Sequence, residues 1–74
     1  MITDEKMSKE VSDLMIEIYQ QMQQSVYAVR DTCPPEEYAS YNRAVGRIVA
    51  CILSEVLEPL YSHNPTLKPD GWDD

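Results

Sequence analysis

Residues 38–60 constrain the fold most, because they form the most apolar run of the chain and closely follow a proline pair. Their apolar side chains recur every three or four positions, which predicts an amphipathic helix. Pro35 followed by two glutamates is typical of a helix start, and Pro34 is kept out of the helical region because a proline follows it. We therefore expect a helix over about residues 35–60, ended or kinked near Pro59.

A first helix is expected over about residues 4–30, which contain neither proline nor glycine. Thr3 is a suitable N-cap residue, because its hydroxyl can accept a bond from a free amide of the first turn. The apolar positions repeat after eleven residues, a spacing close to that of a straight helix. They form a stripe made of Met7, Val11, Met15, Ile18, Met22, Val26, Val29 and Cys33. Ile16 and Tyr27 fall outside this stripe, on the far face.

The break between these two helices is only about four residues long, which predicts that they are antiparallel neighbours. Pairing residues whose numbers sum to 66 or 67 aligns the two apolar stripes. The pairs run from Val26 with Tyr41 near the loop to Met7 with Leu60 at the open end. We therefore expect an all-α fold, an antiparallel two-helix hairpin over residues 1–61.

Residues 62–74 contain two prolines, a glycine and three aspartates, so we expect an extended acidic tail there. Leu67 and Trp72 are its only large apolar side chains. Trp72 between aspartates would suit a basic, aromatic-lined groove of a partner protein. The alternative, which we favour, is a disordered terminus or a tail whose Trp72 packs onto its own hairpin.

The second helix carries more apolar surface than the first helix can cover. The leftover arc consists of Gly46, Val49, Ala50, Leu53 and Leu57. A chain this short buries little core, and such chains often rely on oligomerisation. We expect a homodimer in which the two copies of the second helix form the centre of a four-helix bundle. A monomer whose tail covers the arc is the alternative.

The formal net charge of −7 is unevenly distributed, with −3 on residues 1–20, 0 on residues 21–54 and −4 on residues 55–74. Acidic ends oppose binding to phosphate groups and anionic lipids. We expect no membrane span, since no apolar run approaches the ~18 residues that a spanning helix needs. We expect a cytoplasmic, reducing location, because two cysteines form no disulfide framework and no signal peptide is apparent.

No combination of residues in the sequence predicts catalysis. Cys33 precedes a helix N-terminus, which can activate a thiol, but it also continues the apolar stripe. Cys51 is expected to be a semi-buried packing residue, and His63 to be solvated or to cap the second helix. A zinc site needs about four ligands, and no Cys/His cluster is present. We expect no catalytic residue, no metal site, no cofactor and no enzymatic activity.

Arg43 and Arg47 lie four residues apart and form the only concentrated positive charge. The sequence favours a small acidic protein-interaction module: an adaptor, chaperone-like or regulatory protein that acts as a homodimer and binds a further protein. The residues expected to contact that partner are Trp72, Leu67, Arg43 and Arg47. The alternative is a nucleic-acid-associated regulator that uses Arg30 with these two arginines, which the net charge disfavours.

Overall fold

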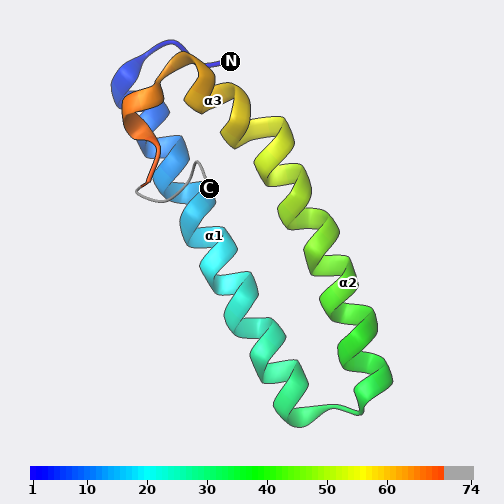
Figure 1. Ribbon diagram of the computed structural model, residues 1–74. Helices are drawn as coiled ribbons and strands as arrows, with labels where there is room; N and C mark the ends of the chain where they lie inside the picture. The colour runs from blue at the N-terminus through cyan, green and yellow to red at the C-terminus, as the bar shows by residue number, and fades with distance from the viewer. Residues whose placement is uncertain (70–74) are drawn as a thin grey trace.

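The computed structural model describes residues 1–69 as an antiparallel helical hairpin, and none of these residues forms a strand (Figure 1). The elements are α1 (Glu5–Thr32), α2 (Pro35–Cys51), the π-helical turn η1 (Ile52–Leu57), α3 (Glu58–His63) and the 3₁₀ turn η2 (Pro65–Leu67). α2, η1 and α3 run on without interruption and form a second arm that returns alongside α1. The predicted all-α hairpin is confirmed, and it measures 44 × 21 × 16 Å.

The start of α1 is capped by Asp4 rather than by Thr3. Oδ1 of Asp4 accepts a hydrogen bond from the N–H of Met7 at 2.8 Å, which satisfies one of the free amides of the first turn. At its other end α1 reaches Thr32, and α2 starts at Pro35, so the connection is shorter than the predicted loop.

The π-helical turn η1 lies immediately before the proline of the second arm. Pro59 has no N–H, and in a regular α-helix its ring would clash with the carbonyl of Glu55. The N–H of Glu58 reaches back five residues to the carbonyl of Leu53, the bond that defines a π-helix. The arm therefore passes Pro59 through one wide turn and continues to His63.

This wide turn changes which side chains face α1. It holds about one residue more than an α-helical turn, which delays the rotation by about 100°. In an uninterrupted α-helix, Leu57 would lie about 120° from Val45 and would point away from α1. Leu57, Leu60 and Tyr61 are instead only 3%, 0% and 1% exposed, and they form the core cluster of the hairpin.

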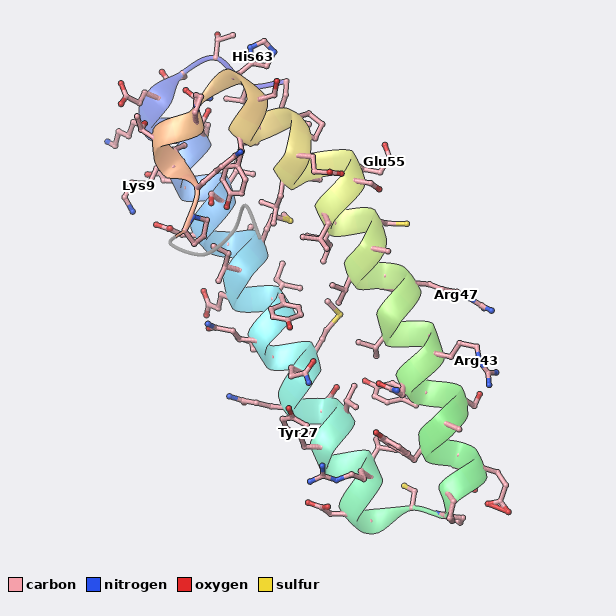
Figure 2. All side chains as sticks on the ribbon, in the orientation of Figure 1. Lys9, Tyr27, Arg43, Arg47, Glu55 and His63 are labelled. Atoms are coloured by element: carbon pink, nitrogen blue, oxygen red, sulfur yellow. The ribbon has the colours of Figure 1, made fainter. Side chains whose placement is uncertain are left out.

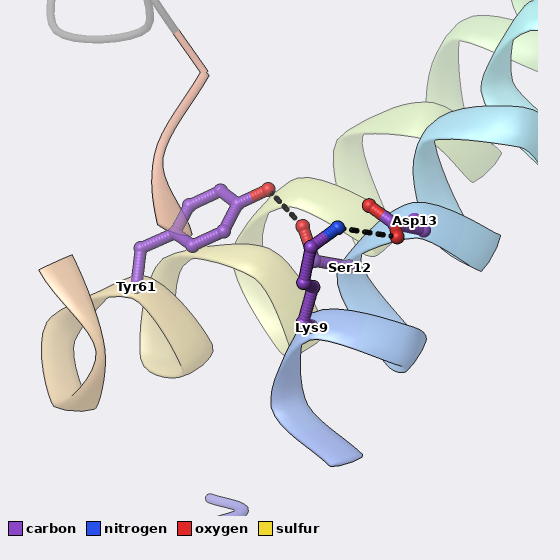
Figure 3. A network of polar contacts seen from close by, with 4 residues as sticks. All are labelled: Lys9, Ser12, Asp13 and Tyr61. Carbon is purple, nitrogen blue, oxygen red and sulfur yellow. Dashed lines mark hydrogen bonds and ion pairs between the residues drawn. The ribbon is translucent and has the colours of Figure 1, made fainter. Parts of the chain in front are cut away.

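Polar side chains join the two arms at the open end of the hairpin. The hydroxyls of the buried residues Ser12 and Tyr61 are hydrogen-bonded at 2.6 Å (Figure 3). Ser8 Oγ donates to the carbonyl of Ile2 at 3.1 Å, and Asn64 Nδ2 donates to Ser8 Oγ at 3.2 Å. We call these five residues the end cluster, because they tie the N-terminal segment and α1 to the end of α3.

The predicted register holds near the loop and is wrong at the open end. Near the loop, a hydrogen bond of 2.7 Å joins Ser25 and Tyr41, whose numbers sum to 66 as predicted. At the open end, Ser12 is bonded to Tyr61, and their numbers sum to 73. The π-helical turn η1 accounts for only about one residue of this shift, because one wide turn holds about one residue more than an α-helical turn. Met7, which was assigned to the buried stripe, is exposed.

The segment after α3 departs from the predicted extended tail. α3 includes residues 62 and 63, and η2 adds a 3₁₀ turn before the last described residues. Leu67 is half-buried and packs against the core cluster. The start of the tail therefore covers its own hairpin.

Removing the Tyr61 hydroxyl alone should cost more stability than its contact with Ser12 contributes. Tyr61→Phe leaves the buried Ser12 hydroxyl without this partner, so we expect the unfolding free energy to fall by about 1–3 kcal/mol. The double variant Ser12→Ala/Tyr61→Phe removes both hydroxyls and should lose less than the sum of the two single variants. Urea unfolding at fixed protein concentration measures all three. Strictly additive losses would contradict a direct coupling.

Candidate interaction surface

A groove of about 260 Å³ lies between the two arms. Its lining comes from both arms: Ile16 and Tyr19 of α1, Val49 of α2, and Ile52, Leu53 and Leu57 of η1. None of these side chains is charged, so the groove suits apolar side chains of a partner better than a polar substrate. We call this side of the hairpin the groove face.

Small residues of α2 leave the edge of the groove uncovered. Apart from Gly46, its two neighbours in the chain and the adjacent helix backbone, no heavy atom of the described residues lies within 4 Å of the position that a Cβ of Gly46 would take. Ala50 is also exposed. At about 100° of rotation per residue, both lie on the same side of Val45 as the groove-lining Val49. A second helix could therefore approach α2 closely along this edge.

The five residues predicted to form the dimer interface have different environments. Gly46 and Ala50 are exposed, and Val49 and Leu53 are half-buried in the groove. Leu57 is buried in the core cluster and only forms part of the groove floor, which leaves it little surface for a second copy. The cause is the π-helical turn, which rotates Leu57 towards α1.

Ile16 is the groove residue that the sequence stripe missed. It was assigned to the far face of α1, yet it is half-buried and lines the groove. The buried side of this part of α1 follows Ser8 and Ser12, and Ile16 continues their spacing of four residues. A search for small polar residues at helical spacing, as well as for apolar ones, could have located this side.

A second apolar surface lies on the opposite side of the hairpin. We call it the back face; it is formed by the exposed side chains of Met7, Leu14, Tyr41 and Ile48. Leu14 lies about 160° around α1 from Ile16, and Ile48 lies about 140° around the second arm from Leu53. The hairpin thus presents apolar side chains on both broad sides.

The three arginines of the proposed positive patch have different surroundings. Arg43 and Arg47 extend away from α1, and neither forms an ion pair among residues 1–69 (Figure 2). Arg30 is paired with Asp31 at 3.1 Å, and its guanidinium lies 5.0 Å from the centre of the Tyr27 ring. Local contacts within α1 therefore occupy Arg30.

The residues considered for chemistry are dispersed. Cys33 is half-buried at the loop, and Cys51 is exposed rather than semi-buried as expected. His63 is exposed at the end of α3, where the following residue, Asn64, bonds to the carbonyl of Leu60 through its N–H. In the part of the chain that the structure describes, no three His, Cys, Asp or Glu residues form a group that could hold a metal ion.

The two tail residues expected to contact a partner differ in status. Leu67 packs onto the core cluster of its own chain, which leaves it little surface for another protein. Trp72 lies outside the described residues.

Comparisons with known proteins do not assign the chain to a family. No protein-family model, curated protein or solved structure matches it. Across residues 1–69, no helix has both the length and the apolar character needed to cross a membrane.

Truncating Leu57 should destabilise the hairpin far more than truncating Ile48. Leu57→Ala leaves a cavity in the core cluster and should lower the unfolding free energy by about 2–5 kcal/mol. Ile48→Ala removes a side chain that is 50% exposed, so we expect less than half of that loss. Thermal unfolding of the two variants at equal concentration makes the comparison. Equal losses would show that Leu57 is not a core residue.

Proposed function

We propose that this chain is a protein-interaction module that acts as a homodimer of helical hairpins joined through their groove faces. The small core carries this proposal. Among residues 1–69, the buried hydrophobic side chains are Val26, Val45, Leu57, Leu60 and Tyr61. Five such residues are few for a stable domain, and association with another chain supplies the burial that a short chain lacks.

The groove face has the dimensions and chemistry of an interface between copies. A side of 44 by 21 Å can supply the ~800 Å² per partner that stable interfaces bury. Its lining is apolar, and Gly46 and Ala50 allow a second backbone to come close. Two-fold symmetry would pack the same face of both copies together, so that each groove receives side chains from the other hairpin.

The back face would bind a different protein. When two groove faces are buried against each other, the two back faces remain on the outside of the bundle. Exposed aliphatic side chains on an acidic chain suit a partner with an apolar patch bordered by basic residues. A dimer offers two such faces, which fits an adaptor or a regulator that brings two partner molecules together.

Nucleic acid is a weaker choice of partner. Of the three arginines in the alternative patch, Arg30 is paired with Asp31 and Arg43 and Arg47 form no ion pair within residues 1–69, and the net charge of −7 repels a polyanion. Acidic side chains of a protein partner can pair with Arg43 and Arg47. Such a partner avoids the repulsion that a nucleic acid would experience.

Enlarging Gly46 should disrupt the dimer and leave the hairpin folded. Gly46→Gln has room within a single chain and improves helix propensity, but it blocks the close approach of a second copy. Multi-angle light scattering at micromolar concentration should give two chains for the original protein and one for the variant, with circular dichroism still helical. The matched control is Ala44→Gln, which should stay dimeric. Ala44 lies about 100° from Val45, on the side of α2 opposite to Gly46. A single-chain mass for the original protein would refute the proposal.

Polar substitutions on the back face should remove partner binding without affecting the dimer. Leu14→Ser/Ile48→Ser changes two side chains that are each 50% exposed. We expect affinity capture from extracts of the source cell to lose its specific partner, while light scattering still gives a dimer. Gly46→Ala, on the groove face, is the comparison chain. Capture of the same protein by the Leu14→Ser/Ile48→Ser chain would exclude the back face as the binding surface.

A further inference from the structure

The charged side chains on the outer edges of the hairpin indicate how two copies are oriented. We propose that the hairpins pack with their loops at the same end, so that the second arm of each copy lies against α1 of its partner. This inference rests on the proposed function, because it requires that the groove faces form a homodimer.

Two-fold symmetry allows two ways to stack the groove faces. With the symmetry axis parallel to the helices, the loops lie at the same end and each second arm covers the partner's α1. With the axis perpendicular to the helices, the loops lie at opposite ends, α1 covers the partner's α1, and the second arms cover each other. Both arrangements bring antiparallel helices into contact, so the helix dipoles do not select between them.

Near the middle of the hairpin, the unpaired charges on the outer edges of the two arms have opposite signs. On α1, Asp13 is paired with Lys9 at 2.9 Å (Figure 3). Glu17 forms no ion pair among residues 1–69. Glu17 lies about 180° around α1 from the buried Val26 and is exposed. On α2, Arg43 and Arg47 point away from α1 (Figure 2). Near mid-height, one edge of the hairpin thus presents an acid, and the other presents bases.

The register of the hairpin places these groups at nearly the same height. The bond between Ser25 and Tyr41 aligns residues whose numbers sum to 66, which puts Arg47 level with Tyr19. Glu17 precedes Tyr19 by two residues, so it lies about 3 Å further from the loop. An axis parallel to the helices preserves height, so Arg47 of one copy lies beside the partner's Glu17. Because of the two-fold symmetry, the dimer contains this ion pair twice.

The opposite-end arrangement brings like charges together. Arg47 and Glu17 both lie near the middle of their arms. An axis through the middle of the hairpin would set Arg47 beside the partner's Arg47 and Glu17 beside the partner's Glu17. Like charges at such positions repel each other and weaken the complex. The same-end arrangement replaces both repulsions with attractions.

Charge reversal distinguishes the two arrangements through the dimer dissociation constant, measured by analytical ultracentrifugation at low salt. In the same-end dimer, Arg47→Glu and Glu17→Arg should each raise it roughly tenfold, because two attractive pairs become repulsive. The chain with both changes should return to within roughly threefold of the original value. In the opposite-end dimer, the Arg47–Arg47 and Glu17–Glu17 contacts stay repulsive after either single change, and Arg47→Glu also gains an attraction to the partner's Arg43, so neither single change should raise the dissociation constant. Unchanged or lowered dissociation constants would therefore overturn the proposal.

A distance between the loops gives an independent readout. Thr32 is the exposed last residue of α1, so a spin label at Thr32→Cys, in a Cys33→Ser/Cys51→Ser chain, reports the separation of the loops. We expect a distance below about 30 Å, because neighbouring helices in a bundle lie about 10 Å apart. A distance of about 40 Å or more, the length of α1, would overturn the arrangement while a dimer mass still supported the proposed function. A single-chain mass would overturn both.

Discussion

Pro59 has no N–H to donate to the carbonyl of Glu55, and the rest of the hairpin depends on how the second arm accommodates this. The π-helical turn carries the arm past the proline without breaking it, and it delays the rotation by about 100°. Before the turn, the arm meets α1 through Val45; after the turn, it meets α1 through the core cluster. One absent hydrogen-bond donor thereby decides where the tightest packing forms.

That packing is concentrated at the open end, where the core cluster and the end cluster lie together. Towards the loop, Val26 and Val45 are the buried hydrophobic residues of the described chain. A hairpin only 16 Å thick is a single layer of helices, so each arm can bury one stripe and both broad sides face solvent. The apolar surface left on those sides would supply the driving force for the proposed dimer, because burial of apolar surface is favourable wherever the geometry permits it.

The hairpin could be predicted from the sequence because its determinants are local: a long run without proline or glycine, a proline pair, and helical periodicity. The groove could be predicted only in part. Periodicity assumes that a helix rotates uniformly, and the π-helical turn breaks that assumption at Leu57. The burial of Ser8 and Ser12 could not be predicted either, because serine is usually exposed and these hydroxyls depend on Tyr61 and Asn64, about fifty residues away in the chain. Ile16 was assigned to the wrong side for the same reason.

The end cluster fixes the alignment of the second arm against α1 more than it adds hydrophobic free energy. A typical hydrogen bond adds about 0.5–1.5 kcal/mol to stability, whereas burying a leucine side chain contributes about 1.5–3 kcal/mol. Sliding one arm past the other, however, would separate the buried Ser12 hydroxyl from Tyr61 and remove Asn64 from Ser8, which is costly. Alignment matters beyond the single chain, because it sets the height of Arg47 relative to Glu17 on the opposite edge. A hairpin free to slip could not present matching charges to a second copy, so polar contacts at one end would support recognition along the middle.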